Sequence, residues 1–402
     1  MAVTLSLPFV QAARRRSLIE QCIYLDDAAT TRMAPGVLEV MHRVLADPSL
    51  GNAHARQHPY GAAADQLIEA ARQQVAHTID AKKEEVVFTS GATESNNLAL
   101  RGLSRHLKAQ GRTHIITSAV EHKSVLEPLL SLREEGFEIS ALPVKPCGML
   151  EASSIARELR PHTGLVSVQC VNNEVGTVQP LHEIAEVLSA RQILFHTDAA
   201  QALGKLPFSV KTSRVDLASF SAHKVYGPQG LGALYIREDI ADLIEPLQRG
   251  GGQESGLRSG TVPTALCAAF GEACRLAKVN RFANEILRQR FLDRLAIVEP
   301  IVHGHRDADW RVPNIISLRF AGIENEVLVM ELPGLAIGIG SACNSHAAKG
   351  SHVIKAITGS EQAAAETIRL SFGLMTSTDD LDQAADQIVA TVLRIREAQG
   401  VA

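Results

Sequence analysis

Residues 193–224 read ILFHTDAAQALGKLPFSVKTSRVDLASFSAHK, and this stretch holds the pattern that decides the fold. Two short apolar runs in it, Ile193–His196 and Leu217–Phe220, are predicted to be strands. Each is followed closely by polar residues, Asp198 after the first and Ser221–Lys224 after the second. Nearly continuous apolar runs are typical of strands that are covered on both faces. The stretch therefore predicts a buried sheet with polar groups at its strand ends.

Similar patterns extend in both directions along the chain. Further predicted strands are Glu85–Ser90, His114–Thr117, Leu165–Val171 and Ala233–Ile236. Helical patterns lie between them, such as the amphipathic Asp65–Ile79 and the run Leu181–Ala190. Strands that alternate with helices indicate crossover connections and a mainly parallel sheet. The expected fold class is α/β.

The pattern changes after about Lys278, where a second and smaller unit is expected. A long helical pattern covers 280–296, and a strand is expected over 314–320. These elements predict an α+β domain. The expected division is a large domain over 34–280, a small domain made of 22–33 and 281–402, and an N-terminal extension over 1–21.

The composition limits the classes of function. The chain has 402 residues, of which 46% are hydrophobic and 21% are charged, as in ordinary globular proteins. Its net charge of −4, without a basic stripe that contains aromatic residues, argues against direct nucleic-acid binding. No apolar run is long enough to span a bilayer, so no membrane association is expected. Six cysteines without a CxxC pair favour a reducing compartment.

The first 21 residues leave two interpretations open. Arg14, Arg15 and Arg16 occur in a segment with no acidic residue before Glu20, which is typical of an organellar transit peptide. The alternative is a short extra helix or extension. The expected location is accordingly the cytoplasm, with an organelle as the alternative.

Polar residues gather at four successive strand ends. They are Thr93, Asn172–Glu174, Asp198 and Ser221–Lys224. Ligands of doubly wound sheets bind at the carboxyl ends of the strands. Together these residues predict a ligand site.

The chemistry of this site depends on Lys224, Asp198 and a turn before a predicted helix. A lysine that is partly buried suits Schiff-base chemistry, although a strand-end lysine can also simply reach water. A buried carboxylate needs a cation, and a protonated pyridine nitrogen would serve, although Asp198 can also cap a helix. The turn Ser90–Thr93 offers glycine and a helix N-terminus to a phosphate. This combination points to pyridoxal phosphate (PLP).

The motifs that carry these residues resemble those of a known enzyme family. They are SGATESNN, VEHKSV, VNNEVGTVQP, HTDAAQALGK, SFSAHKVYGPQGLGALY, SGT and GSAC, in order between Ile23 and about Leu370. As a set they resemble the NifS/IscS-type cysteine desulfurases, which are class-V members of the aspartate-aminotransferase-like superfamily. The resemblance implies PLP fold type I, with a large cofactor-binding domain and a small domain that carries Cys343 on a mobile loop.

The resemblance also implies roles for individual residues. Lys224 is similar to the lysine that binds PLP covalently and later moves the Cα proton, and His122 to the histidine that stacks on the ring and acts in acid–base steps. Asp198 would pair with the pyridine nitrogen and Gln201 with the phenolic oxygen. Thr93, Ser221 and His223 would hold the phosphate, and Ala92 would also bind the cofactor. Thr261 is similar to a cofactor-site residue that is donated across a dimer interface, which implies a homodimer. Asn173 and Arg369 would bind the substrate carboxylate.

Cys343 is the residue that would define the reaction. Its small neighbours, Gly338–Ala342, allow a thiolate to travel, whereas Cys22, Cys170, Cys267 and Cys274 fit buried positions. The resemblance implies that L-cysteine is converted to L-alanine. A persulfide forms on Cys343 and passes to a sulfur-acceptor protein, for iron–sulfur cluster assembly, tRNA thiolation or DNA sulfur modification. His346 and His352 suggest a metal, but one cysteine and two histidines fall short of a structural zinc set, and no metal is expected.

Some features depart from the family pattern or suggest rivals. Leu374, Ala53 and Ala55 stand where the family usually has arginine, proline and serine. A selenocysteine lyase or another carbon–sulfur lyase is the nearest alternative and would tolerate loss of Cys343. A nicotinamide oxidoreductase is disfavoured, because the glycines of 250–256 miss the GxGxxG spacing.

Overall fold

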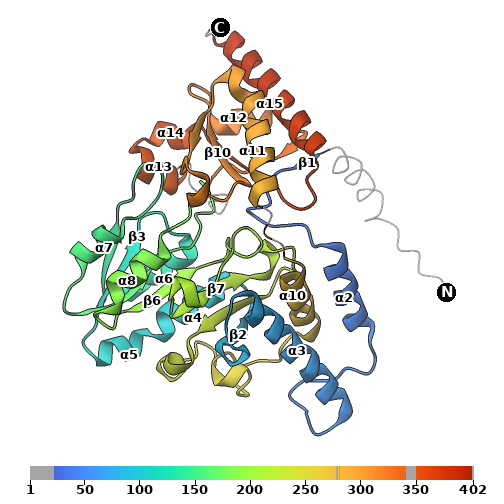
Figure 1. The fold of residues 1–402 in the computed structure, drawn as a ribbon, viewed down its shortest axis with the longest axis vertical. Helices are drawn as coiled ribbons and strands as arrows, with labels where there is room; N and C mark the ends of the chain where they lie inside the picture. Colours follow the sequence, from blue (N-terminus) through green and yellow to red (C-terminus); the bar gives the residue numbers. More distant parts are fainter. Residues whose placement is uncertain (1–21, 278, 280, 341–349, 401–402) are drawn as a thin grey trace, which may run out of the picture.

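The computed structural model describes residues 22–277, 279, 281–340 and 350–400. Its larger part is built on a seven-stranded sheet with the order β2-β8-β7-β6-β5-β3-β4 (Figure 1). The strands are β2 (Val86–Thr89), β3 (His114–Ser118), β4 (Glu138–Leu142), β5 (Thr163–Ser167), β6 (Leu194–Asp198), β7 (Leu217–Ser221) and β8 (Gly232–Ile236).

One strand of this sheet runs against the others. β8 pairs antiparallel with both β2 and β7, and the remaining pairs are parallel. Parallel neighbours need a crossover of a dozen or more residues, and the chain between β7 and β8 is only Ala222–Leu231. That short connection contains Lys224, in the 3₁₀ turn η2 (Ala222–Lys224). The predicted mainly parallel sheet is confirmed.

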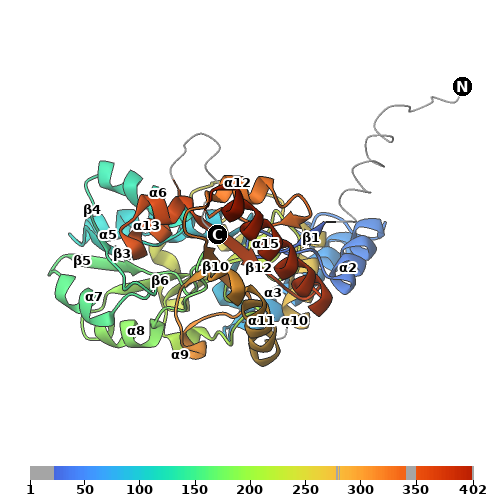
Figure 2. The ribbon, with the colours of Figure 1, turned by 90° about the horizontal axis from the view of Figure 1, so that it is seen from above.

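Both faces of the sheet are buried under helices. Alternate residues of a strand point to opposite faces, so Val86 and Phe88 join one core and Val87 joins the other. On the first face lie α3 (Pro59–Thr78), α7 (Ala152–Glu158), α8 (Leu181–Ser189) and α10 (Thr264–Leu276). On the second lie α4 (Ala92–Gly102), α5 (Ser104–Ala109) and α6 (Lys123–Glu134). Figure 2 shows α5 and α6 on one side of the strands and α7 and α8 on the other.

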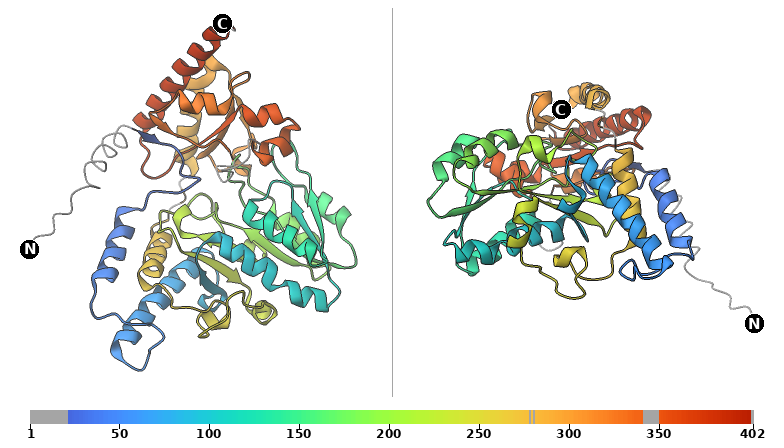
Figure 3. Two further views of the ribbon diagram at one scale, coloured as in Figure 1. Left: turned by 180° about the vertical axis from the view of Figure 1, so that it is seen from behind. Right: turned by 60° about the horizontal axis from the view of Figure 1, so that its bottom comes forward.

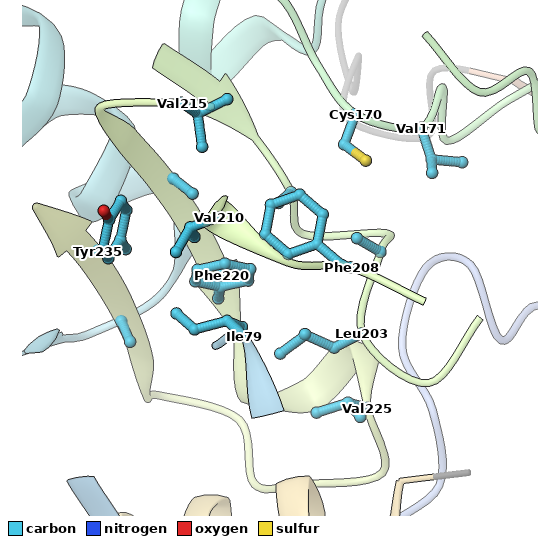
Figure 4. Packing of buried hydrophobic residues seen from close by; sticks show 14 of the residues in the cluster. Ile79, Cys170, Val171, Leu203, Phe208, Val210, Val215, Phe220, Val225 and Tyr235 are labelled. Atoms are coloured by element: carbon cyan, nitrogen blue, oxygen red, sulfur yellow. The ribbon is translucent and has the colours of Figure 1, made fainter. Parts of the chain in front are cut away.

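The first core continues beneath the strand ends that were predicted to hold the site. Phe208 and Phe220 meet edge to face, with ring centroids 5.6 Å apart. Figure 4 shows Leu203 and Val225 in the same cluster. The loop after β6 and the loop after β7 are therefore fixed by shared apolar packing, and α9 (Val210–Ser213) follows the first of them.

A smaller sheet has its own core. It has the antiparallel order β12-β10-β9, with β9 (Ile301–His303), β10 (Ile315–Arg319) and β12 (Thr367–Ser371). Around it are α11 (Arg281–Leu295), α12 (Asn325–Met330) and α15 (Thr378–Ala398), while α13 (His352–Thr358) and α14 (Glu361–Ala365) lie at one side (Figure 1). Large buried side chains such as Phe320 and Phe372 fill this second core.

The start of the described chain connects the two parts. β1 (Ile23–Tyr24) pairs with β11 (Leu335–Ala336), and the chain then passes to α2 (Pro35–Ala46), which packs on α10 (Figure 3). Between them, Asp26 bridges to Ser371 and Thr31 bonds the His223 carbonyl. Residues 26–31 are thus held by both sheets.

The sequence predicted most of these elements but not every boundary. β5 begins at Thr163 and ends at Ser167, earlier than the predicted 165–171, and α3 begins at Pro59 instead of Asp65. The short strands β1, β4, β9, β11 and β12 were not predicted. In residues 22–277, 281–340 and 350–400 no helix has both the length and the apolar character that crossing a bilayer requires. The proposed division into two domains at the stated residues stays a prediction.

Candidate active site

A cavity of about 500 Å³ opens at the carboxyl edge of the large sheet. Loops that follow β2, β3, β5, β6 and β7 contribute to its wall, together with residues 28 and 29 and with Arg369 of the small sheet. Among its lining residues are Ala92, Thr93, His122, Asn173, Asp198, Gln201, Ser221, His223, Lys224 and Arg369. The fold therefore brings together the predicted residues, apart from Thr261 and Cys343.

Asp198 is a buried carboxylate at the end of β6. Its side chain accepts hydrogen bonds from Asn96 Nδ2 at 2.8 Å and from the Ala200 main-chain N–H at 3.0 Å. Both donors are neutral, and Asp198 is only 8% exposed. A negative group in this position is best stabilised by a cation bound in the cavity.

Lys224 reaches across the cavity wall to the N-terminal segment. Its Nζ donates to the main-chain carbonyls of Ala28 at 2.6 Å and Ala29 at 2.7 Å. These contacts hold the amine at the cavity surface, because both acceptors belong to a wall segment.

His122 is both a wall residue and the N-cap of α6. Its Nδ1 accepts the Ser124 main-chain N–H at 3.1 Å and lies 2.8 Å from Ser124 Oγ. An Nδ1 that accepts from the main chain places the proton of the neutral ring on Nε2. Burial lowers the pKa of His122, so the ring is neutral near neutral pH.

An anion cradle forms where α4 begins. Gly91 precedes the helix with a φ of 154°, a conformation that glycine adopts most readily, and the first α4 N–H groups follow it. Ser221 and His223 complete the wall there. His223 Nδ1 lies 3.1 Å from Thr30 Oγ1, and burial lowers its pKa to about 4. His223 therefore acts as a neutral hydrogen-bonding group.

Gln201 and Arg369 each have a buried polar atom that forms no hydrogen bond within the described chain. Gln201 donates from Nε2 to the Ala28 carbonyl at 2.8 Å, while its Oε1 has no partner there. Arg369 pairs with Asp26 at 2.6 Å and donates to the Asn173 carbonyl at 3.1 Å, while its Nε has none there. Such groups are expected to be satisfied by a ligand.

Two predicted residues are not placed in this cavity. Thr261 is exposed and does not line it. Cys343 lies outside the described residues, as do the expected mobile loop and His346. Gly340, three positions before Cys343, does line the cavity. Among the described residues no three His, Cys, Asp or Glu side chains are grouped to bind a metal.

Three contributors, Asn96, Asp26 and Ser351, were not predicted from the sequence, whereas Glu174 and His352 were named there without these contacts. Asn96 orients Asp198, Asp26 pairs with Arg369, and the Glu174 carboxylate accepts a hydrogen bond from Ser351. His352 Nε2 lies 2.9 Å from the Glu121 carbonyl. Asn96 and Glu174 stand inside quoted motifs, so their spacing offered a signal. Asp26 and Ser351 are brought in by tertiary contacts, for which no local pattern exists.

The comparisons with known proteins agree with this geometry. The family model described as aminotransferase class-V matches residues 23–384. A cysteine desulfurase of Pongo abelii is 42% identical over 379 residues, which are 93% of this chain and 82% of the relative. The chain belongs to the class-V aminotransferases, among the cysteine desulfurases.

Solved structures of such proteins have the same architecture. A NifS-like protein matches with a TM-score of 0.85 and 32% identity, over 92% of this chain and 99% of that one. A structure described as SspA in complex with cysteine matches with a TM-score of 0.76 and 38% identity, over 87% and 98% of the two chains. The predicted aspartate-aminotransferase-like fold is therefore confirmed.

Class-V aminotransferases and cysteine desulfurases depend on PLP, and the residues of this cavity fit that cofactor. The cradle at α4 suits the phosphate, and Asp198 suits a protonated ring nitrogen. The buried Gln201 Oε1 that lacks a partner in the described chain indicates that a polar ligand belongs beside it. The start of α4, Asp198 and Gln201 therefore fit the predicted cofactor.

Proposed function

We propose that this chain is a PLP-dependent cysteine desulfurase that converts L-cysteine to L-alanine and transfers the sulfur, through a persulfide on Cys343, to an acceptor protein. The observation that carries the proposal is the convergence of Lys224, Asp198 and Arg369 on one cavity. These three groups supply an amine, a counter-charge for a pyridinium and a carboxylate-binding fork.

The cofactor would be held by residues on three sides of the cavity. Thr93, Ser221 and His223 would bind the phosphate at the start of α4, with Ala92 offering its main-chain N–H. His122 would stack on the ring from the loop before α6. Asp198 would keep the ring nitrogen protonated, and Gln201 would contact the phenolic oxygen. PLP, when bound, withdraws electrons from the amino acid and so makes its Cα proton acidic.

Proton transfer would rest on Lys224 and His122. Lys224 would bind the cofactor and, once its amine is free, accept the Cα proton and deliver it to carbon. His122 is neutral with its proton on Nε2, so it would donate a hydrogen bond to the reacting groups without adding charge, while Lys224 carries the proton. The Ala28 and Ala29 carbonyls would hold the free Lys224 amine close to its place of action.

The substrate carboxylate would bind to Arg369 and Asn173. The Asp26 carboxylate holds one Arg369 nitrogen, and the Nε, which has no hydrogen bond within the described part of the chain, would be a donor for the substrate. Since a guanidinium binds a carboxylate in one plane, this arrangement fixes the Cα of the amino acid relative to Lys224.

The sulfur step would use the Cys343 thiolate as nucleophile. Its sulfur attacks the substrate sulfur, the new S–S bond forms, and the C–S bond breaks with its electron pair left on carbon. That carbon takes a proton and the product is L-alanine, while the persulfide remains on the enzyme. An acceptor thiol then removes the outer sulfur.

A homodimer would complete the site. Thr261 is exposed and lies outside its own chain's cavity, which supports a contact to the phosphate bound in the partner subunit. The location in the cytoplasm or in an organelle stays a prediction, because it depends on residues 1–21, outside the described chain. The identity of the acceptor protein stays open in the same way.

The decisive experiment compares three proteins purified with PLP. Wild type, Lys224→Ala and Cys343→Ser are assayed for alanine and sulfide formed from L-cysteine with a reductant, and their visible absorption is recorded. We expect wild type to be coloured and active, Lys224→Ala to lose the lysine-bound band and activity, and Cys343→Ser to keep the band but lose sulfide formation. Sulfide release by Cys343→Ser at the wild-type rate would instead identify a simple carbon–sulfur lyase, such as a selenocysteine lyase.

A further inference from the structure

A second lysine, Lys205, is buried against the main chain of Lys224. It is 7% exposed, and its Nζ donates a hydrogen bond of 2.9 Å to the Lys224 carbonyl. It belongs to the motif HTDAAQALGK, whose Asp198 and Gln201 line the cavity, although Lys205 itself does not. The motif thus supplies a third polar side chain, placed beneath the site.

The backbone around Lys205 is shaped to bring it there. Gly204 has a φ of 73°, and a Cβ on it would lie 3.3 Å from Val225 Cγ2. Leu203 and Val225, which flank this contact, belong to the core shown in Figure 4. The loops that carry Lys205 and Lys224 are therefore packed together independently of the ammonium.

Lys205 is surrounded by titratable groups from two segments. They are Asp27 on the N-terminal segment and His223 and Lys224 after β7, while Asp26, Arg32 and Tyr226 interact with Asp27. Burial, and then the charge of Lys224, lower the pKa of Lys205 to about 7, while Asp27 favours its charged form. Burial raises the pKa of Asp27 to about 6. Lys205 and Asp27 thus favour each other's charged form beside the cofactor lysine.

Packing alone gives no reason for an ammonium in this place. A methionine has a similar length and would avoid the free-energy cost of burying a charge. The adjacent residue, however, is the lysine whose amine must be neutral to accept a proton. A positive charge disfavours a second positive charge nearby, so a protonated Lys205 would lower the pKa of the Lys224 amine.

We propose that Lys205 is a positioning residue for Lys224: its Nζ holds the Lys224 main chain, and when protonated it disfavours protonation of the Lys224 amine. This inference rests on the proposed function, in which Lys224 binds PLP and moves a proton. It gives a functional role to Lys205, which does not line the cavity that would hold cofactor and substrate.

The test is a pH titration of the visible absorption of PLP bound to Lys224. In Lys205→Met the midpoint should rise by roughly one pH unit, since a neighbouring positive charge is lost. The acidic limb of the kcat profile should move upward with it, and KM for L-cysteine should stay within about twofold because the substrate-binding residues are untouched. Lys205→Arg keeps the charge and should restore the midpoint. The control Lys211→Met removes an exposed lysine and should leave the midpoint unchanged.

Lys205→Gln separates the two parts of the proposal and serves if the methionine variant does not fold. It keeps a donor for the Lys224 carbonyl but no charge, so its midpoint should also rise while it retains PLP better than Lys205→Met. A wild-type midpoint in both neutral variants overturns the inference and leaves the proposed function standing. Absence of the lysine-bound band and of activity in wild type overturns both.

Discussion

At the scale of single residues, the site is a set of charges that the chain only half satisfies. Asp198 has neutral donors, and Arg369 has one carboxylate partner and one nitrogen without a hydrogen bond among the described residues. The sequence predicted both, because Asp198 follows an apolar strand and Arg369 matches the family pattern. It could not predict Asp26 or Lys205, because their contacts join segments far apart in the chain.

Arg369→Lys tests the carboxylate clamp. Lysine keeps the positive charge but lacks the planar fork, so we expect KM for L-cysteine to rise about tenfold or more and kcat to change less. Steady-state kinetics with alanine as product measures both. The matched control is Arg319→Lys on β10, which pairs with Glu366 outside the cavity and should leave KM unchanged. An unchanged KM in Arg369→Lys would contradict the clamp.

At the scale of elements, apolar runs predicted the buried strands well, because burial on two faces dictates their composition. The apolar runs did not predict that β8 is antiparallel to its neighbours, since such a run looks the same for either strand direction. The edge strands β9 and β12 were missed, β9 because it has only three residues and both because they pair only through tertiary contacts. The end of β7 was predicted to within one residue, and Lys224 follows that strand as predicted.

The sheet also contains a buried histidine that should make stability depend on pH. His196 on β6 lies 2.8 Å from Ser167 Oγ on β5 and 3.1 Å from Ser219 Oγ on β7. Burial lowers its pKa from 6.5 to about 3. Because the unfolded chain binds this proton more readily, the stability that neutral His196 provides is present above pH 6.5 and is lost as the pH falls toward 3.

We expect wild type to lose about 1 kcal/mol through His196 between pH 7.5 and pH 5.5. His196→Gln should lose correspondingly less over that interval, although it starts from a lower stability. Denaturant titrations at the two pH values measure the difference. His77→Gln replaces an exposed histidine and should behave as wild type. Equal pH dependence in all three proteins would mean that His196 is not neutral when folded.

At the scale of the whole molecule, the position of Thr261 outside its own cavity makes a prediction about subunits. Thr261→Ala should lower PLP affinity about tenfold, the effect of losing one hydrogen bond to a charged group. If Thr261 serves the partner subunit, mixing Thr261→Ala with Lys224→Ala chains should restore activity. One site of each mixed dimer then has Lys224 from one chain and Thr261 from the other.

The control mixes Thr261→Ala with chains that carry both substitutions, so the same Lys224-bearing chains are present but no dimer can form an intact site. Recovery is measured after unfolding and refolding the chains together, with the dimer fraction followed by sedimentation. Failure of the first mixture to exceed its control would place Thr261 in its own chain's site or outside any site.

The segment of residues 26–31 has a consequence for biosynthesis. It starts beside Leu335–Ala336 and Ser371, near the end of the chain, and gives Lys224 its two carbonyl partners. A ribosome releases these early residues first, yet their Ser371 partner is made near the end, so the segment can complete its contacts only when the chain is almost finished. A truncated product that stops before β12 would carry Lys224 and Asp198 but would lack Arg369 of the cavity wall and the Ser371 contact of this segment. The active cavity can exist only in chains that have been synthesised almost to their end.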